Sequence, residues 1–270
     1  MRISISNLAW DINEDVEVVS LLKEYAIDAI DIAPGKYFPE PDKATLVDIR
    51  AVKTWWHNQG IDIIGMQSLL FGTVGLNVFS SEMVQQMLLR HLTHICRIGS
   101  ELGATRLVFG SPKNRDCTGL SATEIKSKSQ VFFRKLGDIA ADNGVIISLE
   151  PNPIIYGANF MTSSNETYNV VKEIAHSNIK MQLDTGAMII NHENITEVVE
   201  QVRDVIGHIH LSEAHLSPVG DSYAGHAAFA DVLKNYFGGY PATIEMLATP
   251  NEPHLASIRR ALSHVTSLYN

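Results

Sequence analysis

Four ionisable residues stand at or near the ends of apolar, strand-like segments in the second half of the chain. They are Glu150 closing VIISLE, Asp184 closing KMQLD, His210 in GHIHLS and Glu245 in ATIEM. Burying an isolated carboxylate is costly, and a bound cation removes that cost by compensating the charge. Three carboxylates and one imidazole form an oxygen-rich ligand set. We therefore expect one divalent metal ion here, Mn²⁺ first, with Mg²⁺, Co²⁺ or Zn²⁺ as alternatives.

The ordinary alternative is that each of these residues forms an ion pair at the end of a strand. That reading needs a basic partner for each buried group. Lys and Arg total 21 against 30 for Asp and Glu, so the chain is short of such partners. The joint pattern favours a metal site.

Short strand-like runs alternate with longer helical patterns along the whole chain, which indicates a parallel sheet of βα units. The predicted strands are Arg2–Ala9, Ala29–Ala33, Ile61–Leu69, Arg106–Gly110, Val145–Glu150, Lys180–Asp184, Gly207–Leu211 and Ala242–Met246. Helical stretches between them include Glu82–Leu102, Thr123–Asp142 and Ile195–Val205. Eight units in a chain of this size predict a single-domain (β/α)8 TIM barrel over residues 1–270. The sequence contains no GxGxxG or GxxxxGK[ST] pattern, which argues against a doubly wound nucleotide-binding sheet.

The connections support a barrel because they differ in length before and after the strands. Those that enter strands are short, such as Asn143-Gly144. Those that leave strands are longer, as in Pro34–Asp42, Phe71–Ser80, Ser111–Gly119, Pro151–Ser163 and Ser212–Gly225. Loops that follow the strands form the active-site face of such barrels.

The composition limits the partners and the compartment. The formal charge is -9 over 270 residues, which argues against binding to nucleic acid or anionic lipid and favours a small-molecule partner. Cys96 and Cys117 are too few for a disulfide framework and suggest a reducing compartment. No signal-peptide pattern or membrane-spanning apolar run is present, so we expect a cytoplasmic protein.

Several residues near the predicted strand ends are candidates to contact the substrate. Trp10 and Gln67 lie at the ends of the first and third strands, where they could wall or hydrogen-bond a sugar, although barrel packing explains Trp10 equally well. Lys113 and Arg115, in GSPKNR after the fourth strand, could meet an anionic group, with surface charge as the favoured alternative. His208 points to the same side of its strand as His210, and we expect a hydrogen-bonded core histidine rather than a further ligand.

The same segments resemble those of the xylose isomerase-like barrels, a family that includes sugar-phosphate isomerases, ketose 3-epimerases, hydroxypyruvate isomerase and inosose dehydratase. The most specific segments are SLEPN at 148–152, LDTG at 183–186, HIHLSE at 208–213 and TIEM at 243–246. The resemblance spans nearly the full chain. It implies that Glu150, Asp184, His210 and Glu245 bind the metal, and that Glu150 and Glu245 also act as the acid/base pair. It further implies a homodimer or homotetramer, and it makes Asn152 and Glu213 candidate substrate contacts, with a solvated loop glutamate as the alternative for Glu213.

The predicted chemistry is isomerisation or epimerisation of a small sugar or sugar-derived polyhydroxy carbonyl compound. A metal that binds a carbonyl and the adjacent hydroxyl stabilises the enediolate formed when a C–H loses its proton, and two carboxylates can move that proton between faces. A dehydratase of a polyol ketone begins in the same way and is an alternative. A non-catalytic sugar-binding barrel that keeps the ligand set is another.

Three positions depart from the family pattern. Members commonly carry a His three residues after the ligand Asp, an Arg six residues after the ligand His and, in the epimerases, a Glu six residues after the first catalytic Glu. Here those positions are Ala187, Leu216 and Tyr156. Asn152, Gln67, His215, Lys113 and Arg115 are the nearby candidates to replace the missing contacts. We therefore expect a smaller, modified or anionic polyol rather than a plain ketohexose.

Overall fold

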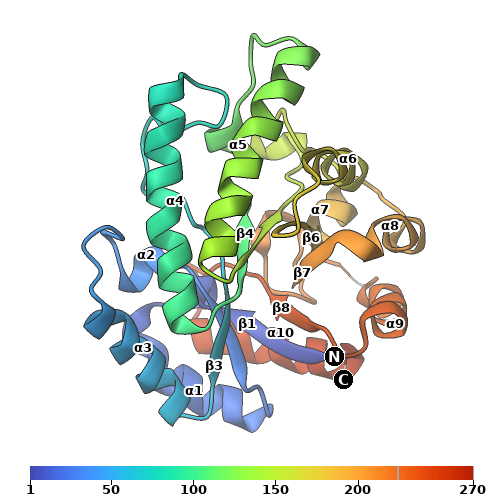
Figure 1. Cartoon of the computed structure of the whole chain (residues 1–270). Coiled ribbons are helices and arrows are strands. Elements are labelled where there is room, and N and C mark those ends of the chain that lie inside the picture. Colours follow the sequence, from blue (N-terminus) through green and yellow to red (C-terminus); the bar gives the residue numbers. More distant parts are fainter. Residues whose placement is uncertain (224, 270) are drawn as a thin grey trace.

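Strands and helices alternate along the chain in the computed structural model, which describes residues 1–223 and 225–269 (Figure 1). Eight parallel strands close into a barrel in chain order, with β1 paired to both β2 and β8. The strands are β1 Arg2–Ser6, β2 Ala29–Ile32, β3 Asp62–Met66, β4 Arg106–Phe109, β5 Ile146–Leu149, β6 Ile179–Asp184, β7 Ile206–Leu211 and β8 Pro241–Ile244. The predicted TIM barrel is confirmed.

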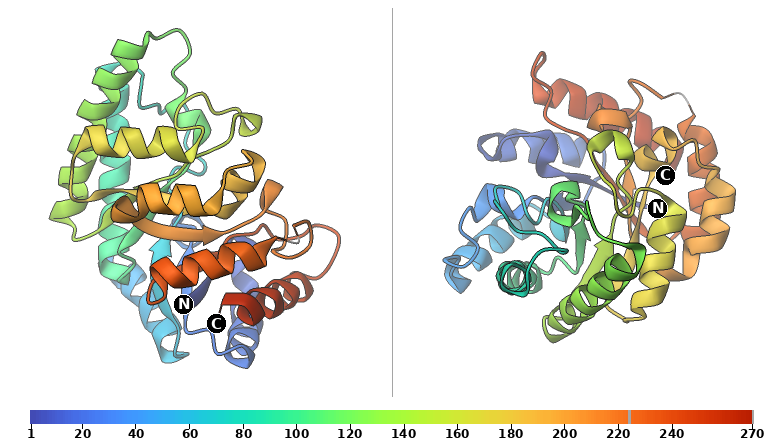
Figure 2. Two further views of the ribbon diagram at one scale, coloured as in Figure 1. Left: turned by 90° about the vertical axis from the view of Figure 1, so that its right-hand side faces the viewer. Right: turned by 90° about the horizontal axis from the view of Figure 1, so that it is seen from above.

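The helices form the outer layer around these strands (Figure 2). They are α1 Asp15–Glu24, α2 Pro34–Tyr37, α3 Leu46–Asn58, α4 Glu82–Leu102, α5 Ala122–Asp142, α6 Ser164–Ile174, α7 Thr185–Ile190, α8 Ile195–Val202, α9 His226–Phe237 and α10 His254–Tyr269. Short 3-10 turns in the loops include Asn7–Ala9, Pro112–Arg115, Ile154–Tyr156, Arg203–Val205 and Ala214–Leu216.

The long helices form because their apolar residues recur on one face. In α4, Leu88, Leu92 and Ile95 follow helical spacing and are buried against the barrel. The helix begins after Ser81, whose hydroxyl accepts a hydrogen bond from the Val84 backbone, and it ends at Gly103 in the left-handed conformation. The predicted bounds of this helix, Glu82–Leu102, are confirmed.

The two ends of the described chain meet beside the closing strands. The amino group of Met1 donates a hydrogen bond to the backbone oxygen of Tyr269, the last residue of α10, at 3.3 Å. Pairing of β1 with β8 runs from Arg2 opposite Pro241 to Ile5 opposite Ile244. Closure of the barrel therefore depends on contacts between segments near the two ends of the sequence.

Several predicted element bounds are wrong by a few residues. The first strand stops at Ser6 instead of Ala9, because Asn7–Ala9 form a 3-10 turn and the Asn7 side chain accepts a hydrogen bond from the Ala33 backbone. The third strand covers Asp62–Met66 rather than Ile61–Leu69, and Ser68 leaves the extended region with a φ of 54°. Likewise, α8 ends at Val202, and a 3-10 turn continues to Val205.

Among the described residues, none of the helices combines the length and apolar character needed to cross a membrane.

Candidate active site

The four ionisable residues singled out from the sequence meet at the carboxyl ends of β5 to β8. Asp184 and His210 lie in β6 and β7 and are directly paired across the two strands, whereas Glu150 and Glu245 each follow the end of their strand. Each offers one ligand atom, and these atoms all lie within 4.8 Å of one another. All four side chains are buried. The structure therefore brings the predicted ligand set together.

His210 lies at the centre of this cluster. Its Nδ1 atom is 3.3 Å from Oε1 of Glu150, 3.2 Å from Oε2 of Glu245 and 3.8 Å from Oδ2 of Asp184. The three carboxylates thus face the same edge of one imidazole. By their spacing, the four groups could hold one ion between them.

The side-chain amide of Asn152 holds the Glu150 carboxylate, and the guanidinium of Arg115 lies behind both residues. Asn152 Nδ2 donates to Glu150 Oε2 at 3.0 Å, and Arg115 donates to Asn152 Oδ1 and to the Glu150 backbone oxygen. Oε1 is buried and has no hydrogen-bond partner within the described part of the chain. One carboxylate oxygen is therefore fixed, and the other is available to the cluster.

Glu245 is held in a comparable way from the opposite side of the barrel. Gln67, which follows β3, donates from Nε2 to Oε1 of Glu245 in a short hydrogen bond. Oε2 is the oxygen that faces His210. Each glutamate thus has one oxygen fixed by a side-chain amide and one directed toward the cluster.

Asp184 is oriented by the first turn of α7 and by Ser212, which follows β7. Its Oδ1 accepts a hydrogen bond from the Ala187 backbone at 2.6 Å, and Ser212 Oγ lies 3.0 Å from both carboxylate oxygens. A side chain on Gly186 would overlap Ser212 Oγ, so the glycine of LDTG is needed for this close approach.

The electrostatics of the cluster reflect three buried carboxylates around one imidazole. Burial raises the pKa of Asp184 to about 8, and the neighbouring carboxylates of Glu150 and Glu245 add to that rise. Burial works to lower the pKa of His210, but Glu245 and Glu150 outweigh it and raise that pKa well above its usual value. The carboxylates thus favour protons on Asp184 and His210, and a bound cation could take over that role.

The residues present fit a divalent metal ion. Bonds of about 2.0–2.2 Å from one ion to N and O ligands place neighbouring ligand atoms roughly 3 Å apart. The separations of 3.2 and 3.3 Å between Nδ1 of His210 and the two glutamates agree with that spacing. Oε1 of Glu150 also points to a bound cation, because it is buried without a hydrogen-bond partner among the described residues. A buried carboxylate oxygen needs a donor or a cation.

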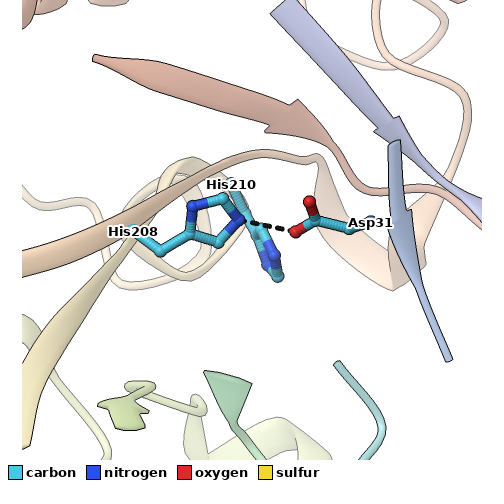
Figure 3. A group of neighbouring side chains, drawn as sticks. All are labelled: Asp31, His208 and His210. Carbon is cyan, nitrogen blue, oxygen red and sulfur yellow. Dashed lines mark hydrogen bonds and ion pairs between the residues drawn. The ribbon is translucent and has the colours of Figure 1, made fainter. Parts of the chain in front are cut away.

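His208 lies below the cluster and bonds to Asp31 of β2 (Figure 3). Its Nε2 is 2.6 Å from Asp31 Oδ2 and 3.1 Å from Thr243 Oγ1, and both side chains of the pair are fully buried. Burial lowers the pKa of His208, so its neutral ring donates to the carboxylate. The expectation of a hydrogen-bonded core histidine is confirmed. Asp31, His208 and His210 could by their spacing also hold an ion, but Asp31 already accepts the His208 proton.

A cavity of about 400 Å³ opens above the four ionisable groups. Three of them, Glu150, Asp184 and Glu245, line it together with Asn152. The remaining wall is mainly apolar, and it also contains Ser212, Glu213 and His215. Its other residues are Pro112, Pro151, Pro153, Tyr156, Gly186, Ala187, Leu216 and Leu247. Concave sites of this size with a few convergent polar groups are typical of small-molecule binding.

Neither Arg115 nor Trp10 lines the cavity, and for Trp10 the structure favours the packing alternative. Arg115 is fully buried behind Glu150, so it is neither an exposed loop charge nor a residue that lines the cavity. Burial lowers the pKa of its guanidinium to about 10, which leaves it protonated near neutral pH. Trp10 is also fully buried, packs against Trp56 and donates from its indole to Asp15. Arg115 thus supports Glu150 from behind, whereas Trp10 belongs to the packed core.

Glu213 and Lys113 also differ in role from a simple substrate contact. The Glu213 carboxylate is buried within its own loop, where it accepts hydrogen bonds from the Gly220 and Ser222 backbones and pairs with His226. It is therefore not solvated, and although Glu213 lies in the wall of the first cavity, its carboxylate is already engaged by its own loop. Lys113 is exposed and lines a second cavity beside the first. Gln67 is buried and reaches the site through Glu245.

Sequence reasoning missed three residues that shape the site: Asp31, Ser212 and Gly110. A side chain on Gly110 would overlap the Glu150 carboxylate. Asp31 lies in the apolar run AIDI, and a charge inside a buried strand is the same signal that marked the four candidate ligands. Ser212 and Gly110 carry no comparable signal, because small residues are common at strand ends.

These features together define one acidic cluster at the carboxyl ends of the strands of a closed barrel. The sequence profile of the xylose isomerase-like TIM barrel family matches residues 19–267. The chain belongs to that family.

Characterised relatives align over part of their length. The chain is similar to L-ribulose 3-epimerase of Methylomonas sp. strain DH-1, at 28% identity over 133 residues, which cover 48% of this chain and 46% of that protein. It is similar to D-psicose 3-epimerase of Enterocloster bolteae at 27% identity over 127 residues, 46% of this chain and 40% of that protein. The alignment thus spans less than half the length of these curated relatives.

Solved structures match the whole fold. D-Psicose 3-epimerase from Clostridium cellulolyticum H10, solved with D-tagatose, superimposes over 100% of both chains with a TM-score of 0.82 and 17% identity. The 3-keto-D-glucoside 4-epimerase of E. coli superimposes over 99% of both chains with a TM-score of 0.79 and 18% identity. At these identities the likeness shows a common fold.

Proposed function

We propose that this protein is a divalent-metal-dependent isomerase or epimerase of a small sugar or sugar-derived polyhydroxy carbonyl compound. The observation that carries this proposal is the pair of glutamates, each with one oxygen fixed by an amide and the other directed at one cluster. The names of the relatives, which are sugar epimerases, support the same class of reaction.

In this proposal Glu150, Asp184, His210 and Glu245 hold the ion, with Mn²⁺ preferred and Mg²⁺, Co²⁺ or Zn²⁺ as alternatives. When bound, such an ion polarises a carbonyl and its neighbouring hydroxyl, which makes the adjacent C–H more acidic. The donor set of three carboxylates and one imidazole supports this assignment.

Glu150 and Glu245 act as the acid/base pair. They approach the cluster from β5 and β8, which lie on either side of β6 and β7 in the barrel. One glutamate removes the proton from the carbon next to the carbonyl, and the other returns a proton to that carbon or its neighbour. Asn152 and Gln67 keep each carboxylate oriented, so that only one oxygen of each is free for this transfer.

We also propose that the protein works in the cytoplasm as a homodimer or homotetramer. Cys96 and Cys117 are buried and unpaired, which is in keeping with a reducing compartment. The assembly follows from the family resemblance alone. Analytical ultracentrifugation tests it, because a monomer at micromolar concentration would contradict the proposal.

The experiment that tests the proposed function is solvent exchange. The Mn²⁺-loaded protein is incubated in D₂O with a panel of keto sugars, and deuterium at the carbon next to the carbonyl is measured by NMR. We expect exchange that EDTA abolishes, and a loss of about 10²–10⁴-fold in Glu150→Gln and Glu245→Gln. Metal content is measured in each variant, because both residues are also proposed ligands. Binding of sugars without exchange would contradict catalysis and favour a non-catalytic sugar-binding barrel.

A further inference from the structure

A second cavity of about 690 Å³ lies directly beside the first. Pro112 and Tyr156 line both, so the two cavities meet at these residues. The wall of the second cavity comes from the loops that follow β3 and β4, residues 68–77 and 111–114. Both cavities therefore belong to the same face of the barrel, and the second is the larger.

Tyr156 is a fixed boundary between the two cavities. Its hydroxyl accepts a hydrogen bond from the His215 backbone at 2.8 Å, and the two rings meet edge to face. His215 and Leu216 have φ values of 59° and 53°, a left-handed conformation that costs free energy for residues with side chains. The loop after β7 is thus held in a strained conformation where it meets Tyr156.

The first cavity offers few partners for a sugar beyond the ionisable cluster. Its wall combines proline, alanine and leucine side chains with a few polar residues. The side chains of Asn152, Tyr156, Ser212 and Glu213 are already hydrogen-bonded within the protein, which leaves His215 as the further polar partner. A hydroxyl buried without a hydrogen bond costs about 1–3 kcal/mol. The first cavity alone is therefore suited to the reacting part of a substrate and poorly suited to further hydroxyl groups.

The second cavity has the composition that the first lacks. The side-chain polar groups of Ser68, Ser111 and Lys113 make no hydrogen bond to other described residues, so they are available to a ligand. Phe71 is 84% exposed and offers an aromatic face at the rim. Sugar rings bind through such combinations, because their C–H faces pack on aromatic rings while their hydroxyls bond to polar groups.

The charge of the second cavity favours a neutral ligand. Lys113 is the one charged side chain among the described residues that line it. Phosphate sites generally combine several donors, such as arginine side chains or a helix N-terminus, with more than one positive charge. A neutral polyhydroxy group therefore fits this lining better than a phosphate.

We propose that the second cavity binds a second glycosyl unit, so that the substrate is a keto sugar carrying a sugar ring on a hydroxyl away from the reacting carbon. This inference rests on the proposed function. The glycosidic carbon cannot be the reacting carbonyl, because an acetal carbon has no carbonyl to enolise. The reacting half lies at the cluster and the attached ring at Phe71 and Ser111, where it supplies binding energy remote from the chemistry.

The test compares deuterium exchange of D-fructose, isomaltulose, maltulose and fructose 6-phosphate by the Mn²⁺-loaded protein. We expect kcat/KM for the two disaccharides to exceed that for D-fructose by about tenfold or more. Phe71→Ala and Ser111→Ala should each reduce that ratio toward one. Val47→Ala removes an apolar side chain that is 78% exposed on α3 and should leave the ratio unchanged. Thermal unfolding of each variant checks that it is folded.

Three results would overturn the inference. Equal exchange of D-fructose and the disaccharides would refute it while leaving the proposed function intact. If fructose 6-phosphate is preferred and Lys113→Ala removes that preference, the second cavity binds an anionic group and not a glycosyl unit. Absence of exchange with every sugar would overturn the proposed function and this inference with it. Calorimetric binding of isomaltulose, weakened in Phe71→Ala, is the supporting result that does not depend on turnover.

Discussion

Gly110 lies directly against the carboxylate of Glu150, just after the end of β4. A Cβ at this position would overlap Oε2, the oxygen that Asn152 holds. Gly186 has the same relation to Ser212 beside Asp184. Two of the candidate ligand positions therefore depend on the absence of a neighbouring side chain.

Gly110→Ala should weaken metal binding and slow exchange by about tenfold or more, because the new methyl group displaces Glu150 from its position in the cluster. Calorimetry with Mn²⁺ and the D₂O exchange rate measure the two effects.

Gly35→Ala is the matched control. A methyl group on Gly35 would point into open space, with no neighbouring atom within 4 Å, so both quantities should stay at the wild-type level in that variant. Unaltered metal affinity and exchange in Gly110→Ala would show that Glu150 does not need this space.

The four ionisable residues can be recognised from the sequence as candidate ligands because each interrupts the apolar pattern of its segment. It does not predict their partners, since Arg115 joins Glu150 across 35 residues and Gln67 joins Glu245 across 178 residues. A basic residue in a loop indicates an exposed charge, and only the folded barrel shows that Arg115 is buried behind the site. Such contacts arise from tertiary packing, which local pattern does not encode.

At the scale of elements, the loop between β7 and α9 is organised by one carboxylate. Glu213 accepts hydrogen bonds from the backbones of Gly220 and Ser222 and pairs with His226 at the start of α9. Burial works to raise its pKa, but these hydrogen bonds outweigh burial and lower the pKa to about 2. The ionised form is thus the one that holds the loop.

Glu213→Gln should reduce the free energy of unfolding by about 2 kcal/mol at pH 7, because the amide replaces only part of these interactions. The pKa is depressed in the folded state, so the stabilisation is present above the usual pKa of 4.5 and is lost as pH falls from there toward 2. The difference between wild type and variant, measured by urea unfolding, should therefore shrink between about pH 5 and about pH 3.5.

Glu17→Gln serves as the comparison, since Glu17 is exposed on α1. Its effect should stay within about 0.5 kcal/mol at every pH. A Glu213→Gln effect that is equally small, or that does not change with pH, would contradict the role assigned to this carboxylate.

The ends of the helices and strands show how far the pattern of apolar residues can predict them. Helix α4 is predicted with its observed bounds because Ser81 and Gly103 mark both ends. Strands β1 and β3 are shorter than predicted, since apolar residues continue past the rim of the barrel after strand pairing has ended. The side-chain pattern records burial, whereas the end of a strand depends on backbone contacts with its neighbours.

At the scale of the whole molecule, the cluster joins the last four strands of a barrel that β1 and β8 close. Without a cation, three buried carboxylates repel one another there, as the raised pKa of Asp184 reflects. Occupation of the site therefore favours the closed barrel over the unfolded chain.

Mn²⁺ should raise the thermal unfolding temperature. Free ion at about 100 times its dissociation constant stabilises the folded state by about 2.7 kcal/mol, which corresponds to roughly 5 °C or more in a chain of this size. Differential scanning calorimetry measures the shift, and EDTA should reverse it. An unfolding temperature that does not respond to any divalent ion would show that the cluster does not bind one.

Titration of Mn²⁺ into the metal-free protein by isothermal calorimetry tests the central claim, that four strand-end residues form a single metal site. We predict one ion per chain in the wild type. Affinity should fall by about 100-fold or more in Asp184→Asn and in His210→Ala, because each removes or weakens one of four ligands. Stoichiometric binding of undiminished affinity in both variants, or no binding in the wild type, would contradict the claim.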